Sequence, residues 1–169
     1  MMTSTQSIRR RLNARMDQLS VGDFTLFLRR VMATIAPGTA YVHNWHIDAI
    51  AAHLHACARG DIRRLVINLP PRMLKSTLVS VAWPAWLLGH EPALRLMAAS
   101  YGQQLANKHS QDCRLVMQAG WYRRIFPEAR LSAGGEREGE VRHYAARLPA
   151  GDVGGWRGDG GGRAYPDRR

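Results

Sequence analysis

The run Leu65-Val66-Ile67-Asn68-Leu69-Pro70-Pro71-Arg72-Met73-Leu74-Lys75-Ser76-Thr77 decides which fold the sequence predicts. Residues 65–69 are mostly apolar, two of them are β-branched, and the two prolines that follow end the run. They are therefore predicted to form a buried strand. After Lys75, apolar residues recur at the spacing of a helix. A loop that leads from a buried strand into a helix is where α/β proteins bind phosphate.

The residue types in this loop are those that bind the phosphates of a nucleoside triphosphate. Backbone N–H groups at a helix N-terminus are unpaired and carry partial positive charge, which satisfies phosphate oxygens. Lys75 is predicted to reach the β- and γ-phosphates, Ser76 to ligate Mg²⁺ through its hydroxyl, and Arg72 to place a charged fork near the γ-phosphate. Met73, Leu74 and Thr77 complete the candidate ATP and Mg²⁺ site.

The loop departs from the phosphate-binding pattern GxxxxGK[ST] at both glycine positions. Leu69 holds the first and Leu74 the second. A leucine at the second position must either avoid a left-handed backbone or accept strain. The competing interpretation is a strand that ends at a Pro-Pro turn, with Lys75 as a solvated lysine in the first turn of a helix.

Further along the chain, an apolar run from Leu94 to Ala99 predicts a second strand, and the spacing of Leu105, His109, Cys113 and Val116 predicts the next helix. Upstream, three apolar patterns predict three helices, the third capped by Asn44 and ended at Gly60. The order strand, helix, strand, helix predicts an α/β fold with a partial parallel sheet, preceded by N-terminal helices.

The net charge indicates a polyanionic partner. Of 169 residues, 24 are Lys or Arg and 13 are Asp or Glu, which gives +11. Nucleic acid is the expected partner. The alternative is a genome that favours arginine, because 22 of the 24 basic residues are Arg. Residues 1–131 carry +10 of this charge, so the ordered part of the chain is expected to hold any polyanion-binding surface.

Cysteine usage and hydropathy give the expected compartment. Cys57 and Cys113 form no CxxC or Cys/His array, so they are expected to be buried free thiols. The longest apolar stretch is interrupted by Ser80 and Pro84, and residues 1–18 lack the apolar core of a signal peptide. We expect a cytoplasmic protein that does not contact a membrane.

Several segments resemble the large subunit of the tailed-phage terminase, the ATP-driven motor that packages DNA. The first is Asp61-Ile62-Arg63-Arg64-Leu65-Val66-Ile67-Asn68-Leu69-Pro70-Pro71-Arg72, followed by Lys75-Ser76. The others, in the family's order and spacing, are Trp83-Pro84-Ala85-Trp86-Leu87-Leu88-Gly89, Glu91-Pro92, Ala99-Ser100-Tyr101, Leu105-Ala106, Cys113-Arg114, Trp121-Tyr122 and Ile125-Phe126-Pro127. In that family the Pro-Pro-Arg block replaces the leading glycine of Walker A. The resemblance therefore implies that the partial sheet is of the P-loop NTPase (ASCE) type and that double-stranded DNA is a partner.

The resemblance implies an ATPase that moves viral DNA into a procapsid as a homo-oligomeric ring, with the small terminase subunit and the portal protein as partners. Hydrolysis in that family also needs a Walker B strand that ends in paired acids, and the sequence after Leu131 contains none. The family's nuclease domain, which binds two metal ions, is missing too. We therefore expect weak nucleotide binding and negligible turnover, with Arg72 as the one residue that has a candidate catalytic role. The alternative function is a non-catalytic nucleic-acid-binding or motor-assembly remnant.

The sequence predicts three parts: an N-terminal helical segment at 1–43, a partial ATPase domain at 44–131, and a disordered tail at 132–169. The tail holds 10 Gly and 7 Arg in 38 residues without apolar periodicity. This composition is expected of coding DNA read out of frame, so we expect a truncated or frameshifted terminase gene. The alternative is a genuine Gly/Arg tail that contacts nucleic acid.

Three further candidates are weaker. Trp45 and His46 are expected to contact the adenine. In the alternative, Trp45 packs at the start of a helix and His46 faces the solvent. The histidines at 43, 46, 53 and 55 lack the HExxH spacing of a zinc site. Ser100 and Tyr101 follow the second strand and are expected either to sense the γ-phosphate, to face DNA, or to pack within a loop. A helicase-like P-loop protein would share Lys75 and Ser76 but leaves the Pro-Pro-Arg block unexplained.

Overall fold

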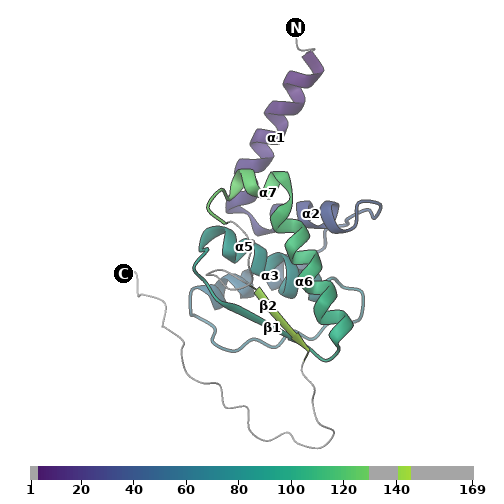
Figure 1. The fold of residues 1–169 in the computed structure, drawn as a ribbon, viewed down its shortest axis with the longest axis vertical. Helices are drawn as coiled ribbons and strands as arrows, with labels where there is room; N and C mark the ends of the chain where they lie inside the picture. Colours follow the sequence, from purple (N-terminus) through teal and green to yellow (C-terminus); the bar gives the residue numbers. More distant parts are fainter. Residues whose placement is uncertain (1–3, 130–140, 146–169) are drawn as a thin grey trace, which may run out of the picture.

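The computed structural model describes the backbone of residues 4–129 and 141–145 and the side chains of residues 6–129. Helices dominate this part of the chain (Figure 1). In order, the elements are α1 (Ser4–Gly22), α2 (Phe24–Ile35), α3 (Trp45–Ala58), α4 (Lys75–Thr77), the π-helix η1 (Leu78–Ala82), α5 (Trp83–His90), β1 (Leu96–Ser100), α6 (Gln103–Gln118), α7 (Gly120–Ile125) and β2 (Val141–Ala145).

The three predicted N-terminal helices are confirmed, and local chemistry explains where they begin and end. The Asp23 carboxylate accepts hydrogen bonds from the N–H groups of Thr25 and Leu26, which caps α2. Asn44 caps α3 as predicted, because its side chain accepts from the N–H of Trp45. Gly60 follows α3 with φ of 83°, the left-handed conformation that ends many helices.

One apolar core joins these helices to the second half of the chain. Phe27 of α2 is fully buried and contacts the rings of Trp121, Tyr122 and Phe126, with centroids 5.4 to 6.2 Å away. The hydroxyl of Tyr122 donates to the carbonyl of Ala85 at 2.7 Å, which ties α7 to α5 inside the core. Residues on both sides of the predicted boundary at 43/44 therefore share this core.

The buried strand predicted for residues 65–69 is absent. This segment has no regular secondary structure and joins no strand ladder among the described residues. Leu65, Ile67 and Leu69 pack against the core, whereas Val66 is 91% exposed. A parallel strand needs cover on both faces and a neighbour in the sheet, and here the helices cover one face only.

The strand at 96–100 is confirmed, with an unexpected partner. β1 pairs in parallel with β2, in register from Leu96 opposite Val141 to Ser100 opposite Ala145, and β2 runs beside β1 near α6 (Figure 1). β2 lies within the tail that was predicted to be disordered; the rest of that tail is outside the described residues.

The predicted α/β P-loop fold class is therefore wrong. The described part of the chain is mainly helical, and its β-structure is limited to the two-stranded ladder of β1 and β2. A short apolar run is as compatible with a segment that packs its side chains on helices as with a sheet strand, and periodicity alone does not separate the two.

The helix predicted after Lys75 is confirmed and runs without a break through residues 75–90. A proline inside a helix usually kinks or ends it, because it lacks the backbone donor. Instead, a π-helical stretch precedes the proline, and the N–H of Trp83 bonds to the carbonyl of Leu78, five residues back. A wider turn of this kind accommodates a residue that lacks an amide hydrogen.

Candidate phosphate-binding site

Residues 70–77, here called the Lys75 turn, have an unusual backbone. Arg72 has φ of 66° and Leu74 has φ of 58° and ψ of 8°. Among the described residues these two are the non-glycine residues with positive φ. A left-handed residue other than glycine costs about 1–2 kcal/mol. The leucine at the glycine position of the phosphate pattern thus adopts the glycine's conformation and accepts the strain.

A left-handed residue next to a right-handed one turns successive amides toward one side of a chain. Leu74 is left-handed and Lys75 begins the helix, and such a left-handed and right-handed pair makes an anion-binding concavity of N–H groups. The first amides of the helix lack partners within it, and the Leu74 side chain provides no cap. The helix behind them continues through residues 75–90, so its dipole adds positive charge at this end.

Two basic side chains lie on the turn. Arg72 is exposed and Lys75 is half-buried, and neither takes part in an ion pair within the described part of the chain. Ser76 is exposed beside Lys75, so its hydroxyl is open to a ligand, while Met73 and Thr77 are half-buried. Leu74 packs against the core, which anchors the strained residue. The structure therefore brings together Arg72, Lys75 and Ser76 at one helix start.

Trp45 and His46 lie on a different element, in the first turn of α3. Trp45 is 75% exposed, and its ring contacts that of His46 with centroids 6.3 Å apart. His46 is 8% exposed, so the predicted solvent-facing alternative is wrong for this residue. Its Nε2 atom has no hydrogen-bond partner among the described residues. This ring contact joins Trp45 to His46 and does not place either residue against the Lys75 turn.

The four histidines from 43 to 55 have separate environments. His43 lies between the Tyr41 hydroxyl at 3.1 Å and the Asp48 carboxylate at 2.8 Å. His53 bonds to the carbonyl of Ala49, and the ring of His55 packs perpendicular to the stacked rings of Trp83 and Trp86. A search of the described residues finds no group of three His, Cys, Asp or Glu side chains placed to hold a metal ion.

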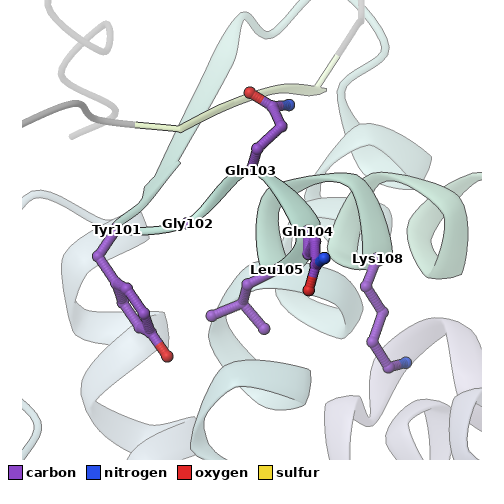
Figure 2. A pocket seen from close by; sticks show the side chains of 6 residues that line it. All are labelled: Tyr101, Gly102, Gln103, Gln104, Leu105 and Lys108. Atoms are coloured by element: carbon purple, nitrogen blue, oxygen red, sulfur yellow. The ribbon is translucent and has the colours of Figure 1, made fainter.

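Ser100 and Tyr101 stand at the carboxyl end of β1, where the sequence placed them. Tyr101 is 84% exposed and lines an open hollow of about 500 Å³ with Gly102, Gln103, Gln104, Leu105 and Lys108. Figure 2 shows the side chains of Tyr101, Leu105 and Lys108 directed to the same side of the helix start, while Gln103 points to the other. The Lys108 ammonium pairs with the Asp112 carboxylate at 2.6 Å, so this lysine already has a counterion.

Sequence reasoning missed two features near the candidate site. Gln104 and Lys108 line the hollow beside Tyr101, and the signal available was their position in the first turns of a helix that follows a strand. The left-handed backbone of Arg72 was also missed, because nothing in the residue type favours φ above zero. Both cysteines are free, as predicted; Cys113 is buried and Cys57 only partly so.

A scan against protein-family models, a search of the curated proteins and a search of solved structures each return no match for this chain. Within the described residues, every helix is too short or too polar to cross a lipid bilayer.

Proposed function

We propose that the Lys75 turn binds the phosphates of a nucleotide, and that the chain is a fragment related to the phage terminase large subunit, which it resembles. In a complete enzyme of that kind, ATP hydrolysis drives viral DNA into the procapsid. In this chain we expect the Lys75 turn to bind ATP weakly, with Mg²⁺ held through Ser76, and turnover to be negligible.

One observation carries the proposal: Leu74 is held in the left-handed region immediately before Lys75. Strain of this kind persists where surrounding structure imposes it, and it concentrates at ligand-binding turns. Here the imposed conformation is the one that exposes consecutive amides at a helix start. A Pro-Pro turn that only connects two segments does not require this conformation, because a right-handed or extended residue can occupy the same position without strain.

Side-chain charge supports the same assignment. Lys75 and Arg72 supply two positive charges without carboxylate partners in the described residues, whereas Lys108 at the Tyr101 hollow is neutralised by Asp112. An anion therefore gains more at the Lys75 turn than at the start of α6, although both are helix N-termini.

Hydrolysis is not part of the proposal, because it requires a carboxylate to orient water and to complete the Mg²⁺ coordination. The sequence supplies no strand that ends in paired acids after the turn. We expect phosphate release in the presence of Mg·ATP to stay at the background rate.

Thermal shift with inorganic tripolyphosphate tests the site without the nucleotide base. We expect tripolyphosphate to raise the Tm of the parent chain, since a ligand that binds only the folded state stabilises it. Lys75→Ala should abolish the shift. The chain has one other lysine, so Lys108→Ala is the matched control and should preserve the shift.

The two variants also locate any binding that occurs. Loss of the shift in Lys108→Ala with retention in Lys75→Ala would move the anion site to the Tyr101 hollow and refute the assignment. An equal shift in both variants and the parent would show that tripolyphosphate binds the basic surface without a specific turn.

A second candidate function is binding of double-stranded DNA as a non-catalytic motor remnant. It is favoured by Arg63 and Arg64, which are exposed on the segment before the turn and form no ion pair within the described residues. Each phosphate contact contributes about −0.9 to the slope of log K against log salt concentration.

A salt titration of duplex binding separates the two functions. We expect Arg64→Gln to make the slope of log K against log salt concentration shallower by about 0.9, the value of one phosphate contact. Arg123→Gln, which removes an exposed arginine from α7, should leave this slope unchanged. Steep salt dependence together with no tripolyphosphate shift in the parent would favour the DNA-binding remnant over the nucleotide site.

A further inference from the structure

Helix α1 (Ser4–Gly22) projects from the helical body along most of its length (Figure 1). Its last turns are anchored: Asp17 pairs with Arg30 of α2 at 2.6 Å and with Arg124 of α7 at 3.0 Å, and Ser20 is fully buried. Residues 6–15 are exposed throughout. A helix of this length is only marginally stable without tertiary packing. Its exposed part therefore needs either a binding partner or residues of high helical propensity.

An apolar stripe runs along the exposed side of α1. Ile8, Leu12 and Leu19 are 55%, 59% and 46% exposed, and the spacing of four and seven residues places them on one face. Asp17 is five residues after Leu12, about 140° around the helix at about 100° per residue. The anchored side and the apolar stripe therefore face in nearly opposite directions.

Arginines border this stripe on both sides. By the same spacing, Arg11 and Arg15 fall along one edge of the stripe and Arg9 along the other. None of these three forms an ion pair among the residues that the structure describes. Residues 1–16 contain four arginines and no Asp or Glu, and the one carboxylate of α1, Asp17, pairs with Arg30 and Arg124.

We propose that this face of α1 is a docking surface for an acidic amphipathic helix of a different protein. A narrow apolar stripe with spacing of this kind fits the seam between two helices, and flanking arginines select a partner with carboxylates at its edges. A second copy of α1 would oppose arginine to arginine. A bilayer requires a broader apolar face than three aliphatic residues provide. The docking surface does not depend on the Lys75 turn.

A designed peptide of about three heptads, with Leu at positions a and d and Glu at e and g, is the probe. Fluorescence anisotropy of the labelled peptide measures its binding to the full chain. We expect Leu12→Gln to weaken binding by about ten-fold or more, because a buried leucine contributes about 1.5–3 kcal/mol. Leu115→Gln on α6 removes a leucine that is 47% exposed, against 59% for Leu12, and should leave binding unchanged.

Two comparisons make the result decisive. A scrambled peptide of the same composition should bind at least about ten-fold more weakly than the designed one, since its apolar stripe is gone. Equal binding of both peptides, or of the designed peptide to parent and Leu12→Gln, would overturn the proposal and leave a nonspecific charge attraction. Failure of the designed peptide to bind, or self-association of the chain through α1 in sedimentation, would overturn it as well. Far-UV circular dichroism of each variant shows that the fold is retained.

Discussion

Replacing Gly89 by alanine tests the packing of α5 against the segment that follows α7. An ideal Cβ at Gly89 would lie 2.4, 2.5 and 2.6 Å from three ring carbons of Phe126, including Cγ, which is close to the backbone and cannot swing away. Phe126 is 5% exposed and belongs to the central core. The overlap can be relieved only by moving the helix or the segment that carries the ring.

Two opposing effects set the magnitude. Glycine in a helix is about 1 kcal/mol less favourable than alanine, so the substitution would stabilise an uncrowded helix. Overpacking in a core costs about 1–3 kcal/mol. We therefore expect Gly89→Ala to lower the free energy of unfolding by about 1 kcal/mol, which corresponds to a fall in Tm of about 2–4 °C for a chain of this size.

Urea unfolding of a double-mutant cycle isolates the contact. In a Phe126→Ala background, which removes Cγ together with the ring, Gly89→Ala should become neutral or stabilising, which gives a coupling energy of at least about 1 kcal/mol. Gly120→Ala is the helical control, because its nearest neighbour is an Arg124 nitrogen 3.8 Å away. If Gly89→Ala alone stabilises the chain by about 1 kcal/mol, Phe126 does not pack on Gly89 and the described core is incorrect.

Three further perturbations follow from the same core. Tyr122→Phe should lower the free energy of unfolding by about 1 kcal/mol, because it removes the buried hydrogen bond to Ala85 without creating a cavity; no change in urea midpoint would contradict this. Asp23→Ala should cost about 0.5–2 kcal/mol through loss of the α2 cap, and Asp23→Asn should recover most of it in the same assay. Burial lowers the pKa of both His55 and His90, so as the pH falls these histidines gain a proton in the unfolded chain before they do in the folded one. The free energy of unfolding should therefore have its full value above the unfolded-state pKa of about 6.5 and decrease as the pH falls through it. Urea midpoints at several pH values measure this decline, which a chain with both histidines replaced by glutamine should not show.

The helices were predictable because their signals are local. Asn44 and Gly60 mark the ends of α3 in the sequence, and the apolar spacing after Lys75 identified the helix that begins there. The sheet was not predictable, because a strand is defined by its partner. Residues 65–69 have the apolar and β-branched composition of a buried strand, but their backbone joins no ladder in the described residues. Val141 pairs with Leu96 although the surrounding tail has the composition of a disordered segment.

The candidate site was partly predictable for the same reason. The residue types at Arg72, Lys75 and Ser76 identified a helix start suited to phosphate. The conformation of Leu74 was not determined by its residue type, which disfavours φ of 58°, and it depends on tertiary packing of the leucine against the core. Whether α3 supplies an adenine contact through Trp45 stays a prediction.

Amide chemical shifts of the ¹⁵N-labelled chain, recorded during titration with a non-hydrolysable Mg·ATP analogue, test most directly whether the amides of the Lys75 turn hold phosphate. The account predicts that the resonances of Leu74, Lys75, Ser76 and Thr77 move together with a single dissociation constant, while those at the start of α6, Gln103 and Gln104, stay in place. Saturating shifts confined to the α6 residues, or no shift at residues 74–77 at any concentration of analogue, would contradict it.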